Sequence, residues 1–202
     1  IRVIREQKKG ENMRHKLMII LSLMIFLILQ SSLAFAEINV KIGDKVPNFT
    51  ITDADDKEYE LEKMKGKIIV LVMGPRSKDE NNTWWAEKLD EVYSENDTLE
   101  IFTVLDLRGI PFVITREFVI GKVREKQEYY AVTPLLDWKQ KVNKLLGAEK
   151  KETDIFVINA NGILVYHQKG KYSEEALSVV KDKIDETLKV DEENQINLEG
   201  GN

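Results

Sequence analysis

Apolar and polar residues alternate along this chain with two periods, one typical of strands and one typical of helices. Residues 48–52 alternate with the period of a half-buried strand, and residues 57–61 repeat that pattern after the acidic turn 53–56. These segments predict a β-hairpin. Residues 67–73 form a continuous apolar run, and residues 99–105 form a second one, as is typical of strands buried on both faces of a parallel sheet.

Apolar residues that recur every three or four positions predict helices between and after these strands. In the last helix, Ser173 is a favourable N-cap, and Leu177, Val180, Ile184 and Leu188 share one face. The expected helices cover residues 82–94, 112–130, 138–146 and 173–190.

The second of these helices has the least regular pattern. Phe112, Arg116, Val119 and Val123 fall on one face, but that face includes an arginine, and Gly121 is a poor helix former. The prediction of a helix over residues 112–130 therefore rests only on the spacing of these residues.

The last third of the chain completes the strand pattern. Residues 133–137 are expected to form a short edge-type strand. Residues 154–159 and 163–167 flank Asn161-Gly162, a turn that strongly favours a hairpin. Strands that alternate with helices imply parallel pairing, so we expect an α/β fold, a three-layer α/β/α sandwich with an N-terminal β-hairpin.

The amino end reads as a targeting segment. The first methionine is Met13, and the codons for residues 9–13 can contain a bacterial ribosome-binding site, so residues 1–12 are expected not to be translated; a genuine charged extension is the alternative. Residues 13–36 have the basic, apolar and small-residue regions of a signal peptide cleaved after Ala36. An uncleaved anchor is the alternative. The expected location is periplasmic or secreted.

The composition of the remaining chain limits its function. Residues 37–190 are long enough for one domain, and residues 191–202 are acidic and polar, which predicts a disordered tail. Residues 37–202 carry 24 basic and 33 acidic side chains, a net charge of −9, which argues against nucleic acid and anionic membranes. With one histidine, His167, and no cysteine in this part, we expect neither a metal site nor a cofactor.

Three segments carry a resemblance to a known family. They are residues 65–72, 133–138 and 154–162, and in this order the chain resembles the thioredoxin-like superfamily over about residues 40–189, in the branch of peroxiredoxins and exported thiol reductases. The resemblance implies a thioredoxin-like fold. It places the redox cysteine loop of that branch at residues 75–81, with Lys78 and Asn81, or Ser77, at the cysteine positions.

The chain departs from the family where the family does its chemistry. It has no cysteine, and Thr153 stands where such proteins usually hold a cis-proline. Because the thiolate is the nucleophile in disulfide exchange and peroxide reduction, both activities are excluded. The YtfJ-like family of exported proteins resembles this arrangement.

The loop after the first buried strand is the candidate site. In an open α/β sheet, ligands bind at the carboxyl ends of the strands, and Arg76 and Lys78 suit a carboxylate or phosphate there. A solvated loop is the alternative. Ser77 needs a base to act as a nucleophile, and His167 is expected to lie far away, which leaves Lys78.

Four further residues complete the predicted surface. Trp84 and Trp85 follow the loop; Trp85 shares a helical face with Leu89 and Val92, whereas Trp84 is the candidate exposed anchor. Asp106 and Arg108 end the neighbouring strand. They are expected either to complete a polar pocket or to form a surface ion pair. The predicted binding residues are Arg76, Ser77, Lys78, Trp84, Asp106, Arg108 and Thr153.

Two functions follow from this surface. The first is a redox-inactive binding or adaptor module for a protein, peptide or small anionic ligand, with peptides held by strand addition beside Thr153. The second is an enzyme whose cysteine-free chemistry uses Ser77 and Lys78. A third possibility is that a family name for this chain implies thiol chemistry. The absence of cysteine contradicts such an activity.

Overall fold

The computed structural model describes residues 18, 40–75, 79–107, 109–126, 129–148 and 151–199. The chain divides into two units, residues 1–37 and 38–202, and in the first unit only Met18 is described. The predicted signal peptide therefore lies almost entirely outside the described residues. Within those residues, no helix combines the length and the apolar character that crossing a bilayer requires.

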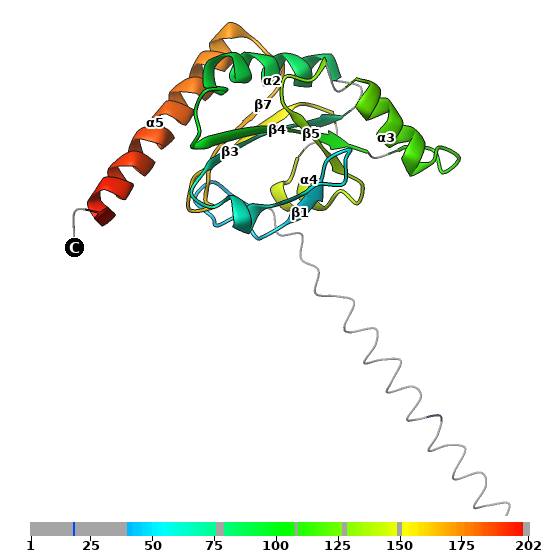
Figure 1. Cartoon of the computed structure of the whole chain (residues 1–202), viewed down its shortest axis with the longest axis horizontal. Coiled ribbons are helices and arrows are strands. Elements are labelled where there is room, and N and C mark those ends of the chain that lie inside the picture. The colour runs from blue at the N-terminus through cyan, green and yellow to red at the C-terminus, as the bar shows by residue number, and fades with distance from the viewer. Residues whose placement is uncertain are drawn as a thin grey trace, which may run out of the picture. The chain divides into compact units, whose positions relative to one another are not determined.

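A seven-stranded mixed sheet forms the centre of the second unit (Figure 1). The strands lie in the order β2-β1-β5-β4-β3-β6-β7, in which β3, β4 and β5 are parallel and the other pairs are antiparallel. Their bounds are β1 Thr50–Thr52, β2 Glu58–Glu60, β3 Ile68–Pro75, β4 Leu99–Asp106, β5 Thr133–Asp137, β6 Asp154–Ile158 and β7 Leu164–Lys169.

Helices cover both faces of this sheet, which confirms the predicted α/β sandwich (Figure 1). On one face, α2 and α5 pack on alternate residues of β3 such as Ile68 and Val70; on the other, η2 and α4 pack on the intervening residues such as Ile69 and Leu71. The continuous apolar run of β3 is explained by this double burial. The helices are η2 Leu61–Met64, α2 Asp79–Tyr93, α3 Arg116–Glu125, α4 Lys141–Leu146 and α5 Glu174–Glu199.

The second predicted helix is wrong in its extent. The chain from Phe112 to Thr115 forms a turn, in which the Ile114 N–H donates to the Pro111 carbonyl. The helix begins only after Thr115, whose hydroxyl accepts from the Phe118 N–H at 3.2 Å. Phe112 therefore lies outside the helix and is 98% exposed.

The final helix also differs from its prediction. Residues 191–199 continue α5 instead of forming a disordered tail. Asp191 anchors this extension, because its carboxylate is buried and accepts from the Ala160 N–H at 3.0 Å. The segment has no proline or glycine before Gly200, so an acidic composition does not prevent helix formation.

Two smaller predictions also need correction. β5 is not an edge strand, because it lies between β1 and β4. Val92 does not join Trp85 and Leu89 in the core but is 47% exposed.

Candidate functional site

The predicted binding residues are only partly described by the structure. Arg76, Ser77, Lys78 and Arg108 lie outside the described residues, so the anion-binding and the serine-nucleophile hypotheses stay predictions. Trp84, Asp106 and Thr153 are described.

A buried polar network occupies the start of α2, directly after the predicted loop. The Thr153 hydroxyl donates to Asn82 Oδ1 at 2.6 Å and accepts from Asn81 Nδ2, also at 2.6 Å. Asn81 Nδ2 also reaches the Gly170 carbonyl at 3.3 Å, and Asn81 Oδ1 accepts from the Tyr172 N–H at 2.8 Å. The network thus joins α2 to the ends of the β6–β7 hairpin.

Gly74 makes this network sterically feasible. A Cβ atom at position 74 would lie 2.3 Å from Asn82 Oδ1, closer than real atoms approach. The amide of Asn82 therefore occupies the space that a side chain on β3 would fill, and Asn82 is only 1% exposed.

These contacts correct the expectation for Thr153. Its side chain is buried, and its hydroxyl is engaged by two asparagines of the same chain. Its carbonyl accepts from the Gly170 N–H at 2.9 Å, so this carbonyl already has a backbone partner in the chain itself. Among the described residues, the Thr153 side chain lies beneath the surface. No described peptide bond is cis.

The other two described candidates have opposite environments. Trp84 is exposed as expected, whereas Trp85 is buried with its ring edge on Tyr172. Asp106 is buried beside Asp137 of the neighbouring strand. The predicted pairing with Arg108 involves a residue outside the described ones. Asp137 caps α4 by accepting from the Lys141 N–H at 2.8 Å.

His167 is held within the β6–β7 hairpin. Its Nε2 lies 2.7 Å from Asp154 Oδ1, and its ring stacks on Phe156 at 4.2 Å between centroids. Asp154 is completely buried. This pairing gives the single histidine of residues 37–202 a structural partner. Among the described residues, no three His, Asp or Glu side chains are grouped so that they could hold a metal ion.

The structure also contains a cavity that the sequence analysis missed. It has a volume of about 350 Å³ and lies between α3, the first turn of α2 and the end of β4. Leu105 and Leu107 form its buried floor. The lining residues are Asp79, Leu105, Leu107, Ile114, Phe118, Val119, Lys122, Val123, Lys126 and Tyr130.

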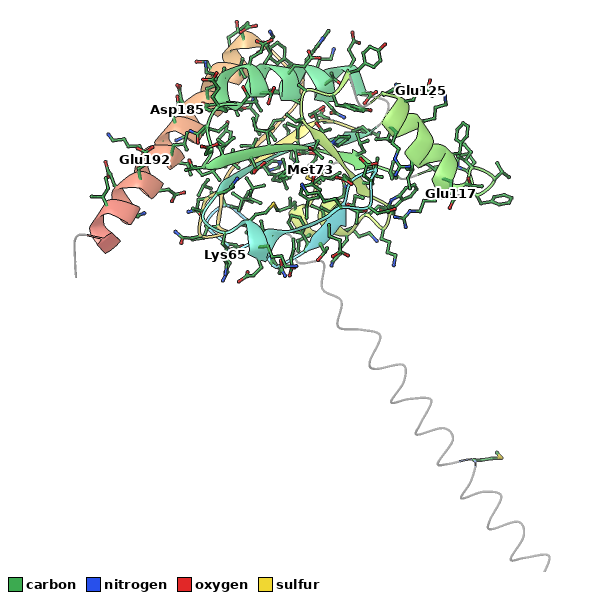
Figure 2. All side chains as sticks on the ribbon, in the orientation of Figure 1. Lys65, Met73, Glu117, Glu125, Asp185 and Glu192 are labelled. Carbon is green, nitrogen blue, oxygen red and sulfur yellow. The ribbon has the colours of Figure 1, made fainter. Side chains whose placement is uncertain are left out.

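The cavity lies beside the buried side chains by which α3 contacts the domain. Ile120 and Val123 anchor α3 beside Leu105, Leu107 and Leu136. Figure 2 shows Glu117 and Glu125 near the two ends of α3, at the margin of the domain.

Charged and phenolic groups lie around this cavity. Lys126 Nζ is 3.7 Å from the Asp79 carboxylate, while Lys122 pairs with Glu125 of its own helix. Burial, with Asp79 as a second cause, raises the pKa of the Tyr130 phenol. The polar groups of the described lining thus belong to four side chains, and the remaining walls are apolar.

A signal for this site is visible in the sequence in retrospect. Residues 110–119 are rich in large apolar side chains although they follow a strand end and a proline. Lys122 and Lys126 then continue the helical face of Val119. The signal was missed because Phe112 was counted as part of a buried helical face.

Comparisons with known proteins agree with the fold. A thiol peroxidase from Listeria innocua is 28% identical over 141 residues, which cover 62% of this chain and 75% of the relative. The solved structure of a Chlorobium tepidum protein assigned as thiol:disulfide interchange protein DsbE has a TM-score of 0.58 at 15% identity and covers 74% of this chain and 99% of its own.

A second solved structure supports the same conclusion. The peroxiredoxin-like protein from Aquifex aeolicus has a TM-score of 0.53 at 18% identity and covers 72% of this chain and 88% of its own. At these identities the solved structures establish the fold alone. The model of the AhpC/TSA family matches residues 42–167. This chain, which has no cysteine, therefore belongs to the AhpC/TSA family.

Proposed function

We propose that this protein is an exported binding module that uses the thioredoxin-like fold of the AhpC/TSA family without thiol chemistry. The absence of cysteine removes the nucleophile on which thiol peroxidases depend. The signal-peptide pattern of residues 13–36 supports the proposed export.

One observation carries the proposal, the open cavity beneath α3. Its volume of about 350 Å³ lies within the range of small-molecule sites, which are concave, mostly apolar and provided with a few polar groups. The cavity borders Asp79 and Leu105, at the carboxyl edge of the parallel strands where ligands of α/β proteins bind.

Nile red, a neutral dye whose emission rises in apolar surroundings, tests this assignment on the purified full-length chain. We expect saturable binding that the substitution Val119→Phe weakens, because the larger ring at this lining position takes up part of the cavity. The matched control is Val179→Phe, on the exposed side of α5. Equal dye binding by both variants would show that the cavity is not a binding site.

A second candidate function, docking of a partner protein, is favoured by the exposed apolar residues near the same helix. Phe112, Val113 and Phe118 are 98%, 70% and 58% exposed. Exposed apolar side chains that lie together mark interaction surfaces. A photo-crosslinking residue at Phe112 should then trap one discrete partner in intact cells, and the same residue at Val179 should not. Identical patterns from the two sites would argue against docking.

A further inference from the structure

We infer that the cavity beneath α3 takes an anionic amphiphile, a carboxylate carried on an unbranched apolar chain. The inference rests on the proposed function and specifies the ligand of the same site. It follows from the walls of the cavity and the charges at its mouth.

The walls favour an acyl chain over a polypeptide. Leu105, Leu107 and Val123 are buried beneath the cavity, and Ile114 and Val119 continue its apolar wall. A peptide would bring an N–H and a carbonyl with every residue. Burial of either group without a hydrogen-bond partner costs free energy. A hydrocarbon chain carries no such groups.

The mouth favours a negative charge. The described lining carries Lys122, Lys126 and Asp79, and Glu125, which pairs with Lys122, lies beside it. Both lysines are more than half exposed, and they lie one helical turn apart on the face that also carries Val119. A ligand carboxylate would therefore meet two ammonium groups within one helical turn.

The present partners of the two lysines do not prevent such binding. Lys126 lies 3.7 Å from Asp79, a long and exposed ion pair, and Lys122 pairs with Glu125 at the surface. Exposed pairs of this kind contribute little free energy, so a ligand carboxylate can replace either partner. Phe118, which is 58% exposed at the mouth, is positioned to cover the bound chain.

The test is displacement of Nile red from the full-length protein by hexanoate, octanoate and decanoate, each below its micelle-forming concentration. We expect the affinity to rise by about fourfold with each added CH₂ until the cavity is full. Decanoate should bind about fivefold more tightly than decanol, and this advantage should fall at high salt.

Substitutions separate the charge from the cavity. Lys122→Gln with Lys126→Gln should remove the advantage of decanoate over decanol. The matched control is Lys88→Gln, which removes an equivalent i,i+3 pair with Glu91 on α2. It should leave the affinities for decanoate and decanol unchanged. Val119→Phe should weaken the binding of both decanoate and decanol.

Each other outcome contradicts a specific part of the inference. Equal affinities for decanoate and decanol, or an advantage that survives the double lysine variant, would overturn the anionic ligand but not the binding site. Failure of every amphiphile to displace bound Nile red, together with a discrete crosslink at Phe112, would replace the amphiphile by a protein partner. Absence of Nile red binding would overturn the proposed function itself.

Discussion

The first turn of α2 and the underside of α3 lie at the same edge of the sheet but differ in how their space is filled. At α2, Asn82 and Thr153 are each 1% exposed, and one hydrogen bond of 2.6 Å connects them. At α3, a cavity of about 350 Å³ separates the helix from Leu105 and Leu107.

The difference shows where this fold has room for a ligand. A buried polar network is stabilising only when its groups are satisfied, and Asn81, Asn82 and Thr153 form hydrogen bonds with one another. The helix α3 buries Ile120 and Val123 against the domain, and the cavity beside them leaves apolar surface accessible. Binding at the cavity therefore does not require the network to open.

The largest expected effect comes from adding one methyl group to the closed region. Gly74→Ala places Cβ against Asn82 Oδ1 and should destabilise the protein by about 3 kcal/mol, through overpacking and loss of the hydrogen bond to Thr153. Urea unfolding measures this change. Addition of Asn82→Ala removes the clash, so the double variant should lose less than the sum of the single losses.

The matched control is the same substitution in the open region. At Gly121, in the middle of α3, an added Cβ meets no atom within 4 Å. Gly121→Ala should therefore stabilise the protein by up to about 1 kcal/mol through helix propensity. If both alanine variants shift the unfolding midpoint alike, the two regions do not differ in packing as described.

A smaller effect is expected from removing one hydroxyl of the network. Thr153→Val keeps the shape of the side chain but leaves Asn82 Oδ1 without its donor, which should cost about 2 kcal/mol. The control is Thr187→Val, whose hydroxyl bonds the Lys183 carbonyl at the surface of α5 and should contribute little. Equal stability of the Thr153→Val variant and the parent would show that the network adds nothing to folding.

The smallest effect is the pH dependence of the open region. Burial raises the pKa of Tyr130 above the value of 10.0 that the unfolded chain has. The unfolded state therefore ionises first, and the stability that this tyrosine contributes is complete below pH 10 and falls as the pH rises through the folded pKa. Tyr130→Phe should reduce this alkaline loss, as urea unfolding at several pH values would measure. An unchanged alkaline slope would contradict the burial of the phenol.

Much of the fold could be predicted from the sequence because burial leaves strong patterns. The apolar run of β3, the Asn161-Gly162 turn and the buried face of α5 were all predicted within a few residues. The resemblance to the thioredoxin-like superfamily was confirmed by the family match and by the solved structures.

The candidate site was harder to predict because the same residue types occur at exposed and at buried positions. Phe112 was assigned to a buried face on spacing alone, yet the turn before Thr115 leaves it in solvent. Thr153 was expected at the surface because the family holds a proline there, but its burial depends on Asn81 and Asn82, more than seventy residues earlier in the chain. Such distant contacts leave no periodic signal.

The close approach of Gly74 to Asn82 has a consequence for how this sequence can evolve. A side chain at position 74 is tolerated only after position 82 has become smaller, and a large amide at position 82 is tolerated only while position 74 stays glycine. The order of mutations is therefore constrained. Among descendants of this sequence, the two positions should change together, eight residues apart in the chain, and an ancestor with a bulkier residue at 74 must have carried a smaller one at 82.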